Sequence, residues 1–455
     1  MRRIWRLAAL LSLLALANAM PAYAQFGLPP VPGPALPSFD RQLGVDDALR
    51  GVSRRPDAAL DARSKALRKV RIRGLRHTYG RQIDVDPAGE PVVRGELVAL
   101  SPSPVVLAKA RVAGFRVLRQ RALGRLGIDV AVLSAPDGQS TRQALGRLRS
   151  LDPDGVFDFN HIYLDAGAVR VSSGGGAAPS TPPAPPSDLA ALADPHAPAS
   201  GGIGLIDGGV DGTAALLREV RLQSWGCAGK AAPSAHGTAV ASLLVGQGHG
   251  FRSAAAGLAL YAANVYCGDA RDGSIDRVAD AFVWLDAAGV TVVNVSLVGP
   301  PNRLLAQLVR STLARGRIVV AAVGNDGPAA PALYPAAYPG VVAVTAVDTR
   351  RRVLPEAGRG PHVLFAAPGS DMVAASGAGY AAVRGTSFAA PIVAGLLAAG
   401  LAGQPNLNAR QALDALATSV VDLGTPGRDP VFGLGLVGEA LRTRGDRLPG
   451  LGRAR

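Results

Sequence analysis

Residues 318–327 read IVVAAVGNDG, and this stretch decides the class of fold. Its first six residues form a continuous apolar run rather than an alternation of apolar and polar side chains. A strand of this kind is typical of a parallel sheet that helices cover on both sides, because both faces of the strand are then buried. The run ends at Gly324, and the amide side chain of Asn325 follows directly.

The same pattern recurs through the second half of the chain. Further apolar runs at Ile203–Ile206, Ala259–Val265 and Val290–Val295 alternate with helical patterns. We therefore predict an α/β fold with a mainly parallel sheet over residues 201–441. In open sheets of this class the functional sites lie at the carboxyl ends of the strands, so polar residues at those ends are the first candidates for function.

Two such residues are Asp207, which ends the first apolar run, and His236, which begins an apolar helical pattern. A helix N-terminus disfavours the charged imidazolium, so His236 needs a carboxylate partner to act as a base. Asp207 can supply that partner. Alone, an aspartate at a strand end is more often a turn or helix-capping residue.

The stretch RGTSFAAPIVAG, residues 384–395, carries the strongest signal. Ser387 stands in the first turn of a long apolar helix, where its backbone N–H has no partner within the helix and can point at a ligand. Asn325 can donate a hydrogen bond to an oxyanion. The ordinary alternatives are a helix N-cap for the serine and a turn residue for the asparagine.

Together, in the order Asp207, His236, Asn325 and Ser387, these segments closely resemble the subtilisin-like serine proteases, peptidase family S8. The resemblance covers about residues 200–441 and implies a three-layer αβα fold. It also implies a secreted endopeptidase that works through an acyl-enzyme intermediate. Other stretches that match the family's usual text are Val293–Leu297, Tyr334–Pro339, Val341–Val344 and Ala366–Gly369.

The resemblance assigns a role to each residue of the four motifs. Ser387 is the expected nucleophile, His236 the general base and then acid, and Asp207 the residue that orients the histidine. Asn325 and the backbone N–H of Ser387 are expected to form the oxyanion hole, where losing one donor typically lowers the rate ~100–1,000-fold.

The resemblance also points to residues that bind substrate. Ser296, Leu297 and Val298 match the strand that holds the substrate backbone, and Leu333 takes a position that lines the primary specificity pocket. Val298 stands where the family often has glycine. We therefore expect a shallow pocket that prefers small or medium apolar side chains to large aromatic or charged ones.

A smaller α+β unit is predicted over residues 96–166, and its pattern runs strand, helix, strand, helix, strand. By pattern and position it resembles the ferredoxin-like propeptide of the family, which serves as an intramolecular chaperone and inhibitor of a proenzyme that processes itself. The elements expected in it are Glu96–Leu100, Val105–Ala113, Ile128–Leu133, Thr141–Leu151 and Val156–Tyr163.

The N-terminal residues of the chain indicate export. Arg2, Arg3 and Arg6 precede the apolar run Leu7–Ala17, and small residues then allow cleavage after Ala19 or Ala24. This pattern predicts a signal peptide, since the run is too short for a membrane anchor. The remaining segments are a basic extension at 25–95, a Gly/Ala/Pro/Ser linker at 167–200 and a basic tail at 442–455. The extension has no assigned function, and the helical pattern at 42–76 within it is expected to form a solvated or loosely packed helix.

Cys227 and Cys267 are the only cysteines. An exported protein meets an oxidising compartment, so a disulfide between them is the favoured prediction, with two unpaired thiols as the alternative. No metal or other cofactor is predicted. Asp269, Asp272 and Asp276 come nearest to a calcium loop, but a polar turn is the better interpretation because Ca²⁺ takes about six to eight oxygen ligands.

The net charge of +14 is spread along the chain without a dense basic block, and aromatic residues make up only 5%, so nucleic-acid binding is disfavoured. The expected partners are protein or peptide substrates and the protein's own propeptide, in the periplasm or outside the cell. A catalytically idle peptide-binding protein, or an enzyme that passes its acyl group to an amine, remains as an alternative.

Overall fold

The computed structural model of the chain describes residues 68–165, 168–170, 202–377, 379–404 and 406–445. We call residues 68–165 the N-terminal region and residues 202–445 the C-terminal region. The predicted signal peptide and basic tail, along with most of the extension and of the linker, lie outside the described residues.

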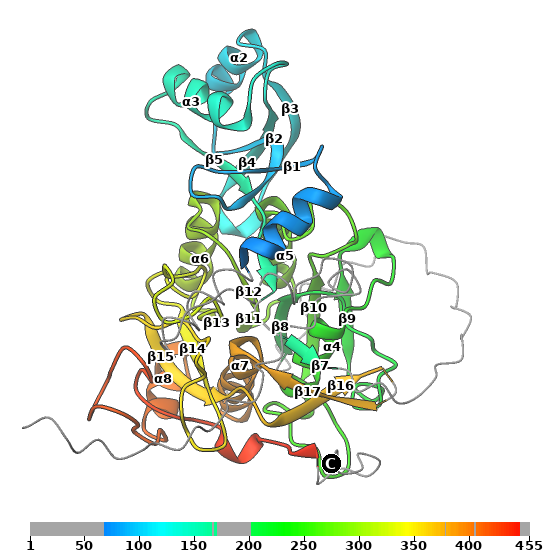
Figure 1. Cartoon of the computed structure of the whole chain (residues 1–455), viewed down its shortest axis with the longest axis vertical. Coiled ribbons are helices and arrows are strands. Elements are labelled where there is room, and N and C mark those ends of the chain that lie inside the picture. Colours follow the sequence, from blue (N-terminus) through cyan, green and yellow to red (C-terminus); the bar gives the residue numbers. More distant parts are fainter. Residues whose placement is uncertain (1–67, 166–167, 171–201, 378, 405, 446–455) are drawn as a thin grey trace, which may run out of the picture. The chain divides into compact units, whose positions relative to one another are not determined.

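The N-terminal region contains an antiparallel sheet, which confirms the predicted α+β unit (Figure 1). Its strands pair in the order β1-β2-β4-β3, and β5 also pairs with β2. A helix covers residues 68–78 ahead of the sheet. The other elements are β1 (Ile83–Val85), β2 (Pro91–Leu100), α2 (Pro104–Val112), β3 (Arg116–Ala122), η3 (Gly124–Leu126), β4 (Asp129–Ser134), α3 (Thr141–Leu151) and β5 (Val156–His161).

The sequence pattern misses two of these strands. β1 and β3 do not appear among the predicted elements, and β2 begins at Pro91 rather than at Glu96. The side chains of β3 alternate between exposed and half-buried, and none is fully buried. Its sequence therefore has no apolar face to reveal a strand, and only pairing with β4 defines it.

The C-terminal region contains the predicted parallel sheet, with the strand order β15-β14-β13-β11-β8-β10-β9. Helices α4 and α7 pack on one face and α5 and α6 on the other, which makes three layers. The strands are β8 (Gly202–Asp207), β9 (Leu222–Trp225), β10 (Ala259–Asn264), β11 (Val292–Val295), β13 (Ile318–Ala322), β14 (Val342–Val347) and β15 (Val363–Pro368). The helices are η4 (Cys227–Gly229), α4 (Ala235–Val245), α5 (Ile275–Ala287), α6 (Arg303–Ala314), α7 (Thr386–Gly403), α8 (Ala409–Ala417) and η5 (Glu439–Leu441).

Strand β13 shows why its continuous apolar run signals this arrangement. Val320 packs in the core with α4 and α7, whereas Val319 and Ala321 pack in the core with α5 and α6. Successive side chains point to opposite faces of the sheet, and both faces are buried. Among the described residues, α7 is the one helix long and apolar enough to cross a membrane, and 67% of it is buried within the fold.

Two small sheets join residues on either side of 166–167 to the C-terminal region. β6 (Leu164–Asp165) pairs antiparallel with β12 (Leu297–Val298). β7 (Ala168–Arg170) pairs antiparallel with β17 (Gly379–Arg384), which also pairs with β16 (Met372–Ser376). β7 thus lies within the linker predicted at residues 167–200.

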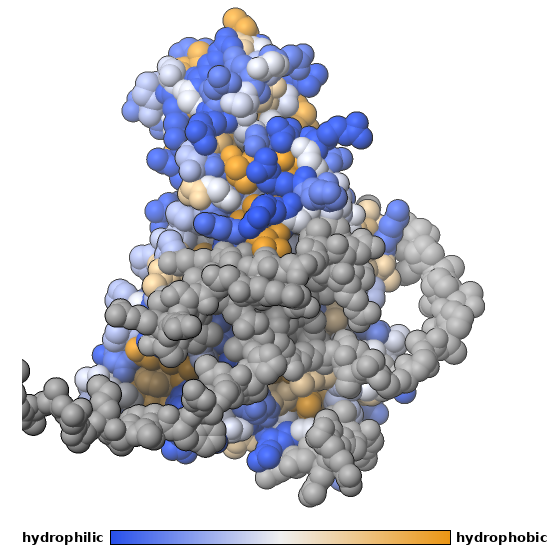
Figure 2. Space-filling model, viewed as in Figure 1, coloured by the Kyte–Doolittle hydropathy of each residue, from blue (hydrophilic) through white to orange (hydrophobic). Residues whose placement is uncertain are grey.

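The two faces of the sheet in the N-terminal region are covered by different parts of the molecule. Leu97 and Leu133 point to one face and pack with residues of α2 and α3. Val98, Val130 and Val132 point to the other face and share a core with residues of α5 and α6. Figure 2 shows mainly hydrophilic residues on the outer surface of this region on the side in view. One of its two apolar faces is thus completed by the C-terminal region.

Candidate active site

Asp207 is the last residue of β8, in the middle of the parallel sheet. Its side chain is 2% exposed and accepts a hydrogen bond from the backbone N–H of Gly208 at 2.5 Å. Its backbone carbonyl accepts from Val265 N–H at 3.0 Å. The carboxylate is therefore held rigidly at the carboxyl end of a central strand, as the sequence predicts.

His236 lies in the first turn of α4, which Ser234 caps by accepting a hydrogen bond from Gly237 N–H at 2.9 Å. A side chain at Gly237 would come within 2.2 Å of the Gly208 carbonyl oxygen, so the helix approaches the loop after β8 as closely as a backbone can. This approach sets His236 Nδ1 2.9 Å from Asp207 Oδ1.

The second ring nitrogen, Nε2 of His236, is buried and has no hydrogen-bond partner among the described residues. With Nδ1–H donating to Asp207, Nε2 carries the lone pair of the neutral ring. This arrangement suits a general base that a carboxylate orients.

Ser387 lies in the first turn of α7, which follows Gly385 in a backbone conformation with φ of 135° that side chains rarely adopt. The serine is fully buried, and its Oγ has no hydrogen-bond partner within the described part of the chain. The ring of the next residue, Phe388, contacts the His236 ring at a tilt of 52°, with centroids 5.3 Å apart. The first turns of α4 and α7 therefore lie side by side.

Asn325 follows β13, the neighbour of β11 in the sheet. Its side-chain oxygen accepts a hydrogen bond from Thr386 N–H at 3.1 Å, and Thr386 Oγ1 accepts from Gly324 N–H at 3.2 Å. These bonds fix the amide beside the residue that precedes Ser387. Thr386 is a positioning residue that the sequence analysis missed, although its place directly before the serine could have indicated it.

The predicted substrate-binding residues also lie together. The Ser296 hydroxyl donates to the Ser387 carbonyl at 3.3 Å and accepts from Asn294 Nδ2 at 2.8 Å. A side chain at Gly324 would come within 2.5 Å of Leu333 Cδ1 and 3.6 Å of Val298 Cγ1. Leu333 and Val298 thus close in on the backbone next to Asn325, and Leu297 pairs with Asp165 in the β12–β6 ladder.

Tyr163, just before β6, is held in a fully buried position. Its backbone N–H donates to Gly273 O at 2.8 Å, and its hydroxyl donates to Pro300 O at 2.8 Å. The Tyr266 hydroxyl donates to Tyr163 O at 2.9 Å. Burial raises the pKa of both tyrosine hydroxyls well above its usual value, so both remain protonated donors. The chain from the N-terminal region is therefore anchored along the predicted substrate strand.

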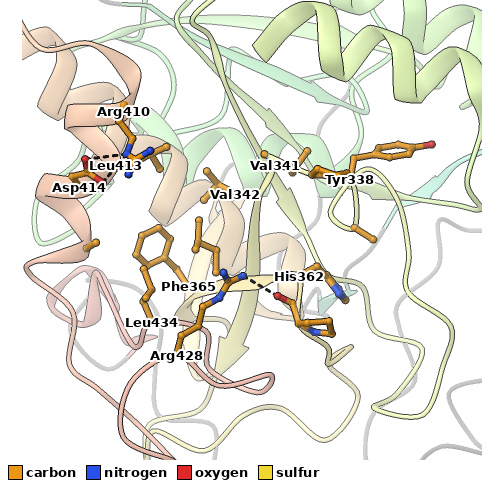
Figure 3. A pocket seen from close by; sticks show the side chains of 16 residues that line it. Tyr338, Val341, Val342, His362, Phe365, Arg410, Leu413, Asp414, Arg428 and Leu434 are labelled. Carbon is orange, nitrogen blue, oxygen red and sulfur yellow. Dashed lines mark hydrogen bonds and ion pairs between the residues drawn. The ribbon is translucent and has the colours of Figure 1, made fainter. Parts of the chain in front are cut away.

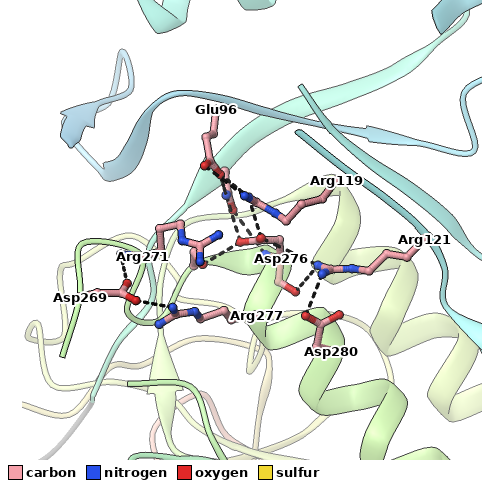
Figure 4. Close-up of polar contacts among 10 residues, drawn as sticks. Glu96, Arg119, Arg121, Asp269, Arg271, Asp276, Arg277 and Asp280 are labelled. Carbon is pink, nitrogen blue, oxygen red and sulfur yellow. Dashed lines mark hydrogen bonds and ion pairs between the residues drawn. The ribbon is translucent and has the colours of Figure 1, made fainter. Parts of the chain in front are cut away.

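Charged side chains link β3 of the N-terminal region to α5 (Figure 4). Arg119 lies 2.5 Å from Glu96 Oε2 and 2.9 Å from Asp276 Oδ2, and Arg121 lies 3.0 Å from Asp280 Oδ2. Asp276 is only 2% exposed. Each of these two arginines, on a strand without an apolar face, therefore has an acidic partner on the other region.

The two aspartates respond to this setting in opposite ways. Burial by itself would raise the pKa of Asp276, but Arg119 and nearby hydrogen bonds hold it below its usual value. Burial raises the pKa of Asp280 to about 6, although Arg121 opposes the shift. Asp276 is thus stabilised as an anion, whereas ionised Asp280 is disfavoured by its burial.

The acidic residues considered for calcium take arginine partners instead. Arg277 lies 2.5 Å from Asp269 Oδ2 and 2.9 Å from Asp272 Oδ1 (Figure 4), while Asp276 contacts Arg119. Within the residues that the structure describes, no group of three or more His, Cys, Asp or Glu side chains is placed to hold a metal ion.

Cys227 and Cys267 form a disulfide, which confirms the predicted bond. Their Cα atoms are 5.1 Å apart. Cys227 follows β9 and Cys267 follows β10, and these neighbouring strands pair in the parallel sheet. The sheet therefore brings the two cysteines into bonding range.

A cavity of about 660 Å³ lies elsewhere in the C-terminal region (Figure 3). It contains none of the predicted catalytic residues. Arg428 on its wall donates to Pro361 O at 2.8 Å, and Arg410 pairs with Asp414 at 3.0 Å. Neighbouring protein groups thus already engage its charged side chains.

Comparison with known proteins identifies the family of this chain. The family model described as the subtilase family matches residues 202–435, about half of the chain. The chain belongs to the subtilase family. Residues 202–435 are a subtilisin-like serine protease domain, and the strand order and helix layers described above are those of its fold.

Two relatives of this subtilase differ in how much of their length the chain covers. It is 32% identical to the minor extracellular protease Epr of Bacillus subtilis over 206 residues, which is 44% of this chain and 32% of Epr. It is 34% identical to subtilisin BL of Lederbergia lenta over 213 residues, which is 46% of this chain and 77% of that protein.

Among solved structures, the subtilase resembles fervidolysin from Fervidobacterium pennivorans, described as a keratinolytic enzyme related to subtilisin. The TM-score is 0.61 at 21% identity, and the match covers 78% of this chain and 61% of that one. At this identity the likeness concerns the fold alone.

Proposed function

We propose that the protein is an exported serine endopeptidase, made as a proenzyme that cuts itself and that its own N-terminal region inhibits. Residues 96–166 then belong to the propeptide domain and residues 201–441 to the peptidase domain. The observation that carries this proposal is the path of the chain from β6 on β12 to β7 on β17, which ends just before Ser387.

In the proposed mechanism Ser387 Oγ attacks the carbonyl carbon of the scissile bond, and His236 Nε2 takes the hydroxyl proton. Asp207 holds the ring through Nδ1–H and stabilises the imidazolium that forms. The negative charge on the carbonyl oxygen is met by the Asn325 amide and the Ser387 N–H at the start of α7. His236 then protonates the leaving amine, and water hydrolyses the acyl-enzyme.

The first substrate is the protein itself. Asp165 pairs with Leu297 on one side of the site, and Ala168 pairs with Arg384 on the other, two residues before Thr386. The proposed cut therefore falls at one of the three bonds between Asp165 and Ala168. For later substrates we propose small or medium apolar side chains before the scissile bond, because Val298 and Leu333 crowd the backbone at Gly324.

Export is proposed from the signal-peptide pattern, and the disulfide is consistent with an oxidising compartment. One of the relatives is named as an extracellular protease. For this chain we propose the periplasm or the cell exterior, without choosing between them.

The test compares residues 25–455 with a Ser387→Ala copy, followed by intact mass, N-terminal sequencing and hydrolysis of a short chromogenic peptide. We expect the wild type to cut itself between Asp165 and Ala168 and then to hydrolyse the peptide, while the Ser387→Ala chain stays whole and inactive. If both chains stay whole and neither reacts with a serine-directed phosphonate, the proposed activity is refuted.

A further inference from the structure

The helix at residues 68–78 buries one side, whereas a solvated or loosely packed helix is expected for this basic segment from its sequence. Ile72 is 7% exposed, and the side chain of Arg68 is 11% exposed. Ile72 shares a small apolar core with Ile162 and Leu164. The helix therefore packs on the segment Ile162–Asp165, whose first residue bridges to Ser274 and whose last two residues pair with β12.

Arg68 ties this helix to the C-terminal region. Its guanidinium lies 2.5 Å from Glu90 Oε2 and 3.3 Å from Asp326 Oδ2. Asp326 directly follows Asn325, the proposed oxyanion donor. Burial raises the pKa of the Asp326 carboxyl although Arg68 opposes the shift, so the carboxylate depends on its cationic partner in this buried setting.

Arg71 ties the helix to the segment that enters the site. It donates to the Asp165 backbone carbonyl at 3.2 Å and also contacts the Asp165 carboxylate. Asp165 pairs with Leu297 and is the last residue of β6. One turn of helix thus contacts the end of the bound segment through Arg71 and Ile72, and the rim of the site through Arg68.

We propose that the helix at residues 68–78 is a clamp that retains the segment Ile162–Asp165 in the substrate site after the cut, and so sets the rate at which active enzyme is released. This inference rests on the proposed function. A cut near residue 166 turns Asp165 into a chain end, and chain ends fray unless other contacts hold them. Because the helix holds that end through Arg71 and the C-terminal region through Arg68, the end leaves the site with the helix only when the Arg68–Asp326 contact also opens.

The test uses the chain from residue 25 to 455 with Arg68→Ala and Arg71→Ala combined. The matched control is Arg73→Ala with Arg76→Ala, which removes the same charge from exposed positions of the same helix. Intact mass follows the cut, and hydrolysis of a short chromogenic peptide follows the release of active enzyme. We expect equal rates of cutting and a lag between cutting and activity that is about tenfold shorter in the clamp variant. Added salt should shorten the lag of the wild type more than that of the clamp variant.

An equal lag in the clamp variant, the control and the wild type overturns the clamp. A chain that starts at Gly80 provides a second test, since it lacks the helix and is expected to cut itself and become active without a lag. If neither this chain nor the clamp variant cuts itself while the wild type does, the helix serves folding rather than retention, and the inference is wrong. Failure of the proposed function is distinct, because the wild type itself would then neither cut nor gain activity.

Discussion

The two main sheets of the molecule are completed in different ways. The parallel sheet of the C-terminal region has both faces covered by helices of that region, α4 and α7 on one side and α5 and α6 on the other. The antiparallel sheet of the N-terminal region covers one face with α2 and α3, while its other face shares a core with α5 and α6. The first sheet has a complete core of its own, and the second does not.

This difference also separates two kinds of polar residue. In the C-terminal region Asp207 is the last residue of β8, and Asn325 follows the end of β13. In the N-terminal region Arg68, Arg119 and Arg121 each have an acidic partner on the C-terminal region, and Arg68 and Arg119 also pair with glutamates of their own region. The C-terminal region therefore contains the residues proposed for catalysis, and the N-terminal region provides a surface that binds the C-terminal region.

The largest expected effect concerns the N-terminal region alone. Separating it exposes Val98, Leu126, Val130 and Val132, which are at most 5% exposed in the whole chain. At about 1.5–3 kcal/mol for each buried side chain the loss is roughly 6–12 kcal/mol, similar to the ~5–15 kcal/mol stability of a whole domain. We expect isolated residues 68–165 to be largely unfolded at 25 °C by circular dichroism and amide hydrogen exchange. The intact Ser387→Ala chain is the folded control, and a cooperative, stable fold of the isolated segment would break the comparison.

The next effect concerns chemistry at the end of a strand. Asn325→Ala removes one proposed oxyanion donor, so we expect kcat of the mature enzyme to fall ~100–1,000-fold. The matched control is Asn302→Ala, which loses the cap of α6 and the hydrogen bond to Phe159 O at 3.0 Å. We expect the control to lower the stability of the uncut chain while the mature enzyme keeps its kcat. Similar kcat values for the two variants would refute the assigned role of Asn325.

A smaller effect is expected where the regions meet. Arg119→Ala leaves buried Asp276 without its closest cation, and the free energy of unfolding of the Ser387→Ala chain should fall by about 2–3 kcal/mol. Arg116→Ala on the same strand removes an exposed arginine and should change it by less than about 0.5 kcal/mol. Urea unfolding measures both, and equal effects would show that the Arg119–Asp276 contact does not stabilise the joined regions.

The smallest effect depends on pH. The pKa of Asp280 is raised from 3.8 to about 6, so ionised Asp280 costs stability. As pH rises from about 4 to about 6 the unfolded chain loses this proton first, and the free energy of unfolding falls. Asp280→Asn removes that slope, and we expect it to stabilise the Ser387→Ala chain by about 1 kcal/mol at pH 8 but not below pH 4. A difference that is the same at both pH values in urea unfolding would contradict this origin.

Local patterns account for much of the fold. The apolar runs at 203–206 and 318–323 lie in β8 and at β13, and α3 has the predicted bounds Thr141–Leu151. These elements have a periodicity that the sequence carries by itself. β3 lacks it, because its half-buried positions are Val117, Arg119 and Arg121, and the two arginines reach Asp276 and Asp280 across the contact with α5.

The candidate site likewise contains residues that the sequence identified and residues that it missed. Asp207, His236, Asn325 and Ser387 stand in motifs that the sequence alone makes recognisable, and the cysteine pair follows from composition and export. The sequence did not identify Thr386 and Tyr163 as site residues. Their roles depend on hydrogen bonds to Asn325 and Pro300, which lie far away along the chain.

The sequence by itself therefore determined the parallel sheet, the family and the residues proposed for catalysis, since strand period and motif order are local properties of the chain. Only the tertiary structure decided how the N-terminal region engages the site: the pairing of Asp165 with Leu297, and the contact of Arg68 with Asp326. The sequence pattern of a basic helix is the same whether its arginines are solvated or pair with a buried carboxylate. Which of the two occurs depends on the surface against which the helix packs in the folded protein.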